Sequence, residues 1–285
     1  MVEKLIRGIR KIRALHELGF SYSNILTALL SNKDVNLNMY GKMNIRRALY
    51  ISYLLKNIRK KGWTIKRVED GFLYENNGLK LYGGLLYGAT INEIFVQEVY
   101  KANVQNKVVI DVGAYLGETA IYFALKGAKK VIAFEPDEEN YRIALKNVNI
   151  NGLADKIMLV NAAVTPACLG LVEFYKAPET GSSTDYENMY DKDNITSVRA
   201  VKSICLDDIV KEEGRIGLLK LDCEGCEYSV LTLFNYFREV DEIILEYHNG
   251  VQNLRNLLSK KGFRTTIIQG RTKKIGILRG SRYGR

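Results

Sequence analysis

The sequence is poor in the residues that hold zinc. It contains only two histidines and four cysteines, and Cys223 and Cys226 form its one C-x-x-C pair. A structural zinc site takes four cysteine or histidine ligands, usually from two such pairs, so the sequence predicts no zinc site. We interpret Cys223 and Cys226 as two unpaired thiols of a cytoplasmic protein, and a redox pair is the alternative.

Long hydrophobic runs are also absent. No segment approaches the roughly eighteen consecutive apolar residues that a transmembrane helix needs, and the first seven residues, MVEKLIR, lack an apolar signal core. We therefore expect a cytoplasmic protein with no membrane partner. The 285 residues are 47% hydrophobic and 26% charged, a composition that can bury a full core in one large domain with an appendage, or in two domains.

Acidic residues are scarce in the first 80 residues, which hold 6 of them against 16 lysines and arginines. Residues 81–285 hold 26 of each, so the whole net charge of +10 lies in the N-terminal part and indicates an anionic partner there. Apolar spacing predicts basic helices over 3–18 and 43–61, with a third ending near Leu30 between them. Such helices are compatible with a helix-turn-helix-like module, although we favour a plain helical cap.

The character of the sequence changes after residue 62. Three short strand-like runs, separated by Asn-Asn-Gly and Gly-Gly, predict a β-meander over 63–89, and a helix is expected over 91–101. We therefore divide the chain into a basic helical region at 1–62, a meander or linker at 63–89, and a larger domain at 90–285.

A glycine-rich turn between a strand and a helix organises the larger domain. The β-branched run that begins at Val108 ends at Asp111, Gly113 and Gly117 flank the turn, and a helix follows from about Thr119. Such a turn holds nucleotide-like ligands, because glycine lets the backbone approach them and the helix N-terminus supplies free N–H groups. The G-x-G-x-x-G motif of dinucleotide folds is missing, which disfavours an NAD enzyme. Asp111 instead favours S-adenosylmethionine, whose sulfonium and ammonium groups attract a carboxylate.

Strand and helix patterns alternate from residue 108 onward, which predicts an α/β fold with a mostly parallel sheet. Two strand-like runs that follow 262 and 273 form a hairpin, so the last strand is expected to be antiparallel. The acidic segment 177–195 interrupts the alternation and is either an active-site cover or a solvated loop. Strands are predicted near 107–111, 130–135, 156–161, 217–222 and 242–247, and helices near 117–127, 137–150, 205–211, 226–237 and 250–262.

Polar side chains follow the later strands at the edge where ligands bind in such sheets. Glu135 ends the second strand, and its carboxylate suits the two hydroxyls of a ribose, whether in NAD or in S-adenosylmethionine. The small residues at 161–163 let an adenine ring approach the backbone, or form only a tight turn. Asp222 and Glu224 follow the fourth strand, where they can orient a donor amine, bind a metal or accept a proton, and His248 follows the fifth as a possible general base.

The sequence resembles the FkbM-type S-adenosylmethionine-dependent methyltransferases over about 90–250. The motifs that carry the resemblance are VIDVGAYLGET at 109–119, AFEP at 133–136, NVNING at 147–152, and KLDCEGCE at 220–227. The last is close to the family pattern K-x-D-x-E-G-x-E. The resemblance does not reach residues 1–80.

The resemblance implies a Rossmann-like class I methyltransferase fold, with a mostly parallel seven-stranded sheet, an antiparallel last strand and a small N-terminal helical region. It also implies S-adenosyl-L-methionine as the methyl donor, with Asp111, Gly113 and Gly117 at its methionine part and Glu135 at its ribose. The predicted catalytic residues are Asp222, Glu224 and His248. The predicted cofactor-binding residues are Asp111, Gly113, Ala114, Tyr115, Gly117, Glu118, Thr119, Glu135, Pro136, Asn161, Ala162, Ala163 and Asp222.

The family is associated with O-methylation of hydroxyls, so the first hypothesis is a methyltransferase that acts on a sugar or another small molecule. An RNA methyltransferase whose basic helices bind nucleic acid is the second, although no N-P-P-[YF]-like tetrapeptide follows the fourth strand. A non-catalytic nucleic-acid-binding protein is the third. No metal site is predicted, although Asp222, Glu224 and His248 could together form an oxygen-rich site for a divalent cation.

Overall fold

The computed structural model describes residues 12, 13, 16, 23, 35–36, 42–43, 45–177, 182–185, 187, 193 and 195–282. It forms two compact units, Met1–Gln97 and Glu98–Arg285. Of the predicted helices over 3–18 and up to Leu30, all but residues 12, 13, 16 and 23 lie outside the described residues. None of the helices within the described residues is long and apolar enough to cross a membrane.

The first unit contains the predicted helix and the predicted meander. Helix α3 buries Ile51, Leu55 and Ile58, which share one face because they recur at helical spacing. Strands β3, β4 and β5 pair as an antiparallel sheet in that order. The elements are β1 (Val35–Asn36), β2 (Lys42–Met43), α3 (Ile45–Lys60), β3 (Thr64–Val68), β4 (Gly71–Asn76), β5 (Leu79–Gly83), α4 (Tyr87–Ile91) and a π-helical turn (Asn92–Val96).

The helix predicted over 91–101 has different bounds. It begins earlier, as α4, continues as the π-helical turn and ends by Gln97, whose N–H bonds the carbonyl of Asn92. Glu98 has a φ of 51°. A left-handed residue cannot continue a right-handed helix, so the prediction was wrong at both ends.

The second unit is built on a seven-stranded sheet in the order β14-β15-β13-β12-β6-β7-β8. β6, β7, β8, β12 and β13 are parallel, while β15 is antiparallel to both of its neighbours. The predicted parallel sheet with an antiparallel last strand is therefore confirmed. The strands are β6 (Val108–Val112), β7 (Lys130–Phe134), β8 (Ile157–Val160), β12 (Ile216–Leu221), β13 (Val240–Tyr247), β14 (Phe263–Gly270) and β15 (Gly276–Arg282).

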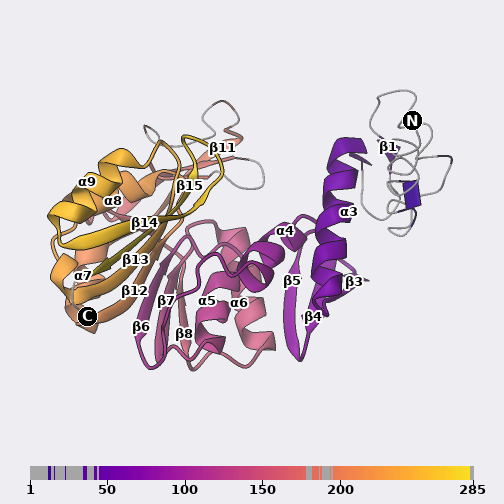
Figure 1. The fold of residues 1–285 in the computed structure, drawn as a ribbon, viewed down its shortest axis with the longest axis horizontal. Coiled ribbons are helices and arrows are strands. Elements are labelled where there is room, and N and C mark those ends of the chain that lie inside the picture. The colour runs from indigo at the N-terminus through magenta and orange to yellow at the C-terminus, as the bar shows by residue number, and fades with distance from the viewer. Residues whose placement is uncertain are drawn as a thin grey trace. The chain divides into compact units, whose positions relative to one another are not determined.

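Helices cover both faces of this sheet, and Figure 1 shows α5 and α6 on one face and α8 and α9 on the other. The apolar runs predicted for the strands are explained by this arrangement, because alternate residues face opposite helical layers. Ile110 and Leu219 pack with Leu231 of α8 and Leu258 of α9. The helices are α5 (Glu118–Leu125), α6 (Glu138–Ile150), α7 (Leu206–Glu213), α8 (Cys226–Leu233), a 3₁₀ turn (Phe237–Glu239) and α9 (Gln252–Lys260).

A small second sheet was only partly predicted. The strand-like runs that bracket the insert pair antiparallel as β10 (Leu171–Lys176) and β11 (Ser197–Cys205). β11 also pairs in parallel with β9 (Ala163–Thr165), a strand that the sequence did not predict. Of the insert at 177–195, the described residues include Ser183, which forms a bridge with Tyr175. Ser183 of the insert therefore lies beside β10.

Candidate functional site

The glycine turn after β6 packs directly against the end of β12. Gly113 has a φ of 80°, and a Cβ there would overlap the carbonyl oxygen of Asp222. Gly117 has a φ of 86° and precedes α5, and a Cβ there would lie 3.2 Å from the Cβ of Ala144. Both positions therefore require glycine. The turn brings the start of α5 and the end of β12 to one edge of the sheet.

Asp111 lies beneath this turn and is fully buried. One carboxylate oxygen lies 3.0 Å from Nζ of Lys220, and the other accepts a 2.5 Å hydrogen bond from the hydroxyl of Thr119. Nζ of Lys220 also donates to the carbonyl oxygen of Gly113 at 2.7 Å. The Asp111–Lys220 pair thus ties β6, β12 and the turn together.

Lys220 was not among the predicted site residues. Its side chain is 1% exposed, and burial alone lowers the pKa of its ammonium, but the charges of Asp111 and Asp222 outweigh burial and raise that pKa. Lys220 is therefore a fully charged, buried group. A lysine within the apolar run Leu218–Leu221 was the signal in the sequence, since a buried lysine requires a buried partner.

Glu135 follows β7 on the same edge, and its side chain is buried. One carboxylate oxygen accepts a hydrogen bond from the backbone N–H of Tyr115, and the other accepts one from the N–H of Asp137, each at 2.9 Å. Burial raises the pKa of Glu135 to about 7. Because a carboxylate has about four lone-pair positions, two backbone bonds leave acceptor capacity for hydroxyls of a ligand.

The other predicted cofactor residues shape this edge through their backbones. Tyr115 has a φ of 49°, which turns its N–H toward Glu135. The side-chain amide of Asn161 donates to the carbonyls of Glu135 and Pro136, so it holds the end of β7 in place. Buried members of the predicted set are Ala114, Glu118, Thr119, Ala162 and Ala163.

Asp222 follows β12, and its backbone packs against Gly113 of the glycine turn. Its N–H donates to the carbonyl of Val112 at 3.0 Å, which continues the pairing of β12 with β6. Its carboxylate accepts a 2.8 Å hydrogen bond from the hydroxyl of Tyr100. Tyr100 lies 122 positions away in sequence, and no local pattern predicted this contact.

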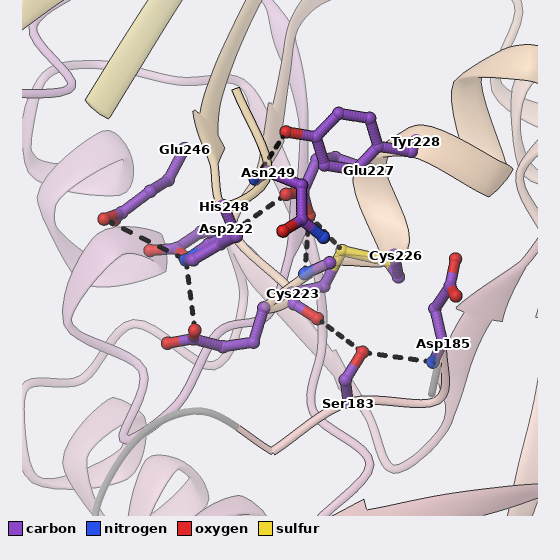
Figure 2. A network of polar contacts seen from close by, with 12 residues as sticks. Ser183, Asp185, Asp222, Cys223, Cys226, Glu227, Tyr228, Glu246, His248 and Asn249 are labelled. Atoms are coloured by element: carbon purple, nitrogen blue, oxygen red, sulfur yellow. Dashed lines mark hydrogen bonds and ion pairs between the residues drawn. A yellow bond between two sulfur atoms is a disulfide. The ribbon is translucent and has the colours of Figure 1, made fainter. Parts of the chain in front are cut away.

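The end of β13 places His248 between carboxylates, as Figure 2 shows. Nδ1 lies 2.9 Å from Oε1 of Glu227, and Nε2 lies 3.0 Å from Oε2 of Glu224 and 4.0 Å from Oε1 of Glu246. Glu227 is fully buried, and His248 is 3% exposed. Asp222, Glu224 and His248 each offer an atom within 4.8 Å of the others. The three predicted catalytic residues therefore converge.

Two opposing effects set the charge of His248. Burial lowers the pKa of its imidazole, but hydrogen bonds to Glu224 and Glu227 and the charges of both carboxylates raise that pKa well above its ordinary value. The contacts with Glu224 and Glu227 therefore favour the protonated imidazole, while burial also raises the pKa of the Glu227 carboxyl.

The turn between Asp222 and α8 is constrained by a disulfide and by two hydrogen bonds. Cys223 and Cys226 form a disulfide, with their Cα atoms 5.4 Å apart, and Cys168 pairs with Cys205. The interpretation of Cys223 and Cys226 as unpaired thiols was therefore wrong, because the turn brings their two sulfur atoms together. The N–H of Gly225 donates to Oε2 of Glu227, and the hydroxyl of Ser183 donates to the carbonyl of Cys223. These contacts fix the segment that carries Glu224.

Residues 111–265 match the family model described as the methyltransferase FkbM domain. That match spans more than half of the chain and includes the glycine turn, Glu135, Asp222, Glu224 and His248. The chain belongs to the FkbM methyltransferase family. The fold is the Rossmann-like class I methyltransferase fold that the sequence predicted.

This FkbM chain is also similar to parts of other methyltransferases. It is 44% identical over 54 residues to the ribosomal protein L11 methyltransferase of Carboxydothermus hydrogenoformans, and 29% identical over 103 residues to that of Acinetobacter baumannii strain SDF. These matches cover 19% and 35% of this chain, and only 18% and 34% of those proteins. The solved structure of M. capricolum TrmK with S-adenosylhomocysteine is 14% identical, with a TM-score of 0.43, and 66% of this chain and 68% of that one are covered.

The residues of the FkbM chain fit S-adenosylmethionine, the donor that this family uses. Glu135 presents a buried carboxylate with acceptor capacity at the position where a ribose is expected. The turn between Gly113 and Gly117 has no side chain at its two glycines and leads into the N-terminus of α5. Carboxylates accept hydrogen bonds from ribose hydroxyls and attract positive charge, so they suit S-adenosylmethionine, which carries both hydroxyls and cationic groups.

A pH dependence of donor binding follows from Glu135. A ribose hydroxyl donates to a carboxylate, so S-adenosylhomocysteine should favour the deprotonated form, which is depleted as the pH falls through the pKa of about 7. We expect about tenfold weaker binding at pH 6 than at pH 8 by proton linkage. Titration calorimetry at both pH values tests this. In Glu135→Gln the binding should be weaker and independent of pH, and equal wild-type affinities at the two pH values would contradict the assignment.

Proposed function

We propose that this protein transfers a methyl group from S-adenosylmethionine to a hydroxyl of a sugar or another small molecule. The observation that carries the proposal is the convergence of Asp222, Glu224 and His248 beside the glycine turn. Gly113 contacts the backbone of Asp222 directly, so the donor turn and the carboxylates share one edge. The carboxylates are acceptors, which suits a hydroxyl that must lose a proton.

The donor half of the site is proposed to consist of the turn and the end of β7. Glu135 would bind the ribose hydroxyls, and Gly113 and Gly117 would let the methionine part approach the backbone. The small residues Ala162 and Ala163 would lie against the adenine. Asp111 is expected to act on the donor through the shape of the turn, because Lys220 and Thr119 bind its carboxylate.

The acceptor half is proposed to consist of Asp222, Glu224 and His248. When bound, S-adenosylmethionine supplies an activated methyl group, so positioning accounts for most of the rate. Asp222 would accept the hydrogen bond of the substrate hydroxyl and take its proton, since it lies closest to the turn. Glu224 would orient the same hydroxyl, and His248 would hold Glu224 in place through their 3.0 Å contact.

Donor binding and transfer can be tested separately. Titration calorimetry with S-adenosylhomocysteine should show binding by the wild type, and its absence would overturn the proposal at its first step. Methyl transfer from labelled donor into separated small-molecule, RNA and protein fractions of a cell extract should label the small-molecule fraction. Label confined to protein or RNA would replace the proposed acceptor class.

An RNA acceptor is the second candidate, and α3 is the observation that favours it. Tyr50 and Tyr53 are 55% and 63% exposed, and exposed Lys56 and Lys60 continue the same face, opposite the buried one. α3 has no acidic residue in its first turn and two basic residues in its last. Exposed aromatic rings beside cations are typical of surfaces that bind single-stranded nucleic acid by stacking.

The α3 surface gives a direct prediction for RNA. Fluorescence anisotropy with a labelled single-stranded RNA should show binding that weakens as salt is raised, because cations on the protein release counterions from phosphate. Tyr53→Ala should weaken binding roughly fivefold or more, from a stacking energy of about 1–3 kcal/mol. Lys56→Ala should also weaken it, whereas Lys260→Ala, at an exposed lysine of α9, should not. Equal effects of the two lysine variants would count against α3.

A further inference from the structure

Three side chains with different metal-binding atoms meet at the carboxyl edge of the sheet. Asp222 follows β12, Glu224 lies two residues further in the turn, and His248 follows β13. One atom from each lies within 4.8 Å of the atoms from the other two. None of the three side chains is fully solvated, since His248 is buried and the two acids are partly buried. The cluster therefore combines an imidazole with two carboxylates in a partly desolvated place.

The imidazole of His248 is oriented as a metal ligand would be. Nδ1 lies 2.9 Å from Oε1 of Glu227, which is fully buried and is also held by the N–H of Gly225. That contact leaves Nε2 pointing toward Glu224 and Asp222. Metal-binding histidines usually have their second nitrogen bonded to a carboxylate in this way, which fixes the tautomer and the orientation of the ring.

The spacing of the ligand atoms suits a common ion. Two neighbouring ligands of an octahedral ion, each about 2.1 Å from the metal, lie about 3.0 Å apart. Nε2 of His248 and Oε2 of Glu224 are 3.0 Å apart. A proton between the two atoms gives the same spacing, so an experiment must distinguish a proton from a metal ion.

We propose that Asp222, Glu224 and His248 bind a divalent transition-metal ion that holds the hydroxyl oxygen of the methyl acceptor. The proposal rests on the methyl-transfer function proposed above and deepens it. One imidazole with two carboxylates suits Mn²⁺ or Zn²⁺ better than Ca²⁺, which takes oxygen ligands almost entirely.

The ion would change how the acceptor loses its proton. A bound cation would lower the pKa of a hydroxyl that it contacts, so the proton would pass more readily to the carboxylate of Asp222 while the oxygen keeps the electron pair. That pair forms the bond to the methyl carbon as the carbon–sulfur bond breaks, and the sulfonium becomes a neutral thioether. Asp222 and Glu224 would contribute carboxylate oxygens as ligands, and His248 would contribute Nε2.

Binding of Mn²⁺ to the full-length protein tests the proposal without any methyl acceptor. Electron paramagnetic resonance of free Mn²⁺ should show one equivalent bound to the wild type after treatment with a chelator and buffer exchange. Glu224→Gln should weaken this binding more than tenfold, and so should Glu227→Gln, because loss of an outer carboxylate typically costs 10–100-fold in affinity. Zn²⁺ should compete for the same site.

The matched control is Glu213→Gln, a carboxylate on α7 that pairs with Lys130 away from the cluster, and it should bind Mn²⁺ as the wild type does. The proposal is overturned if neither Mn²⁺ nor Zn²⁺ binds the wild type at about 1 mM, a weak limit for protein sites. Equal binding by Glu224→Gln and the wild type would also overturn it. Binding of S-adenosylhomocysteine is measured on the same samples to separate the two proposals. If the wild type binds S-adenosylhomocysteine but not Mn²⁺, only the metal site is rejected. If it does not bind S-adenosylhomocysteine, the proposed function itself is rejected.

Discussion

Replacing Asp222 with asparagine is expected to lower the rate of methyl transfer by about 10²–10⁴-fold, the usual contribution of a positioned proton acceptor. Asparagine has nearly the same shape and still accepts the hydrogen bond from Tyr100 through its carbonyl oxygen. The substitution therefore removes the charge and the basicity, and it keeps the packing against Gly113. Turnover of labelled donor, with the acceptor fraction found in the extract screen, measures the loss.

The same variant should keep most of its affinity for the donor. Glu135 and the glycine turn are unchanged in Asp222→Asn, so we expect S-adenosylhomocysteine to bind within about tenfold of the wild type, a difference of about 1.4 kcal/mol. Asp155→Asn is the control, because Asp155 is an exposed carboxylate before β8. A turnover of Asp222→Asn within threefold of that control (roughly 0.7 kcal/mol) would show that Asp222 does not act on the reacting hydroxyl.

Replacing Lys220 with methionine is expected to destabilise the second unit by about 3–5 kcal/mol, because it leaves a buried carboxylate without its partner. Methionine fills a similar volume, and Asp111 would keep the hydrogen bond from Thr119. Urea denaturation measures the loss. The turn would also lose the 2.7 Å bond from Nζ to the carbonyl of Gly113, so donor binding should weaken in the folded variant.

A double-mutant cycle separates the pair from its surroundings. Asp111→Asn combined with Lys220→Met should be more stable than Lys220→Met alone, because no unpaired charge remains buried at the pair. If Lys220→Met costs less than about 1 kcal/mol, near the average for any substitution, the pair does not hold β6 and β12 together. Equal stability of the single and double variants would lead to the same conclusion about the pair.

The sequence predicted those parts of the fold that depend on local periodicity. Apolar runs placed β6, β7, β8, β12 and β13, and the hairpin at the end placed the antiparallel strand, since its two runs are separated by a short turn. β9 was missed because a run of three residues carries no period. The helix at 91–101 was misplaced because its end depends on the left-handed backbone of Glu98.

The proximity of the candidate site residues was predictable where one motif holds several of them. Asp222 and Glu224 came from a single short segment, and their neighbourhood with His248 followed from the rule that parallel strands end at one edge. The partners of these residues were not predictable. Tyr100 reaches Asp222 and Lys220 reaches Asp111 across more than a hundred residues, and only three-dimensional packing pairs them.

The strand β12 has a consequence for how proteins of this kind can diversify. Lys220 bonds the carbonyl of Gly113, and the backbone of Asp222 packs against the same glycine, so in the proposed arrangement one short segment would serve both substrates. A change of acceptor by mutation of β12 would disturb the donor as well. In the insert, the described residue Ser183 contacts the carbonyl of Cys223, on the acceptor side of this edge. New acceptor preferences are therefore expected to arise in the insert at 177–195, while β12 stays constant among descendants of a common ancestor.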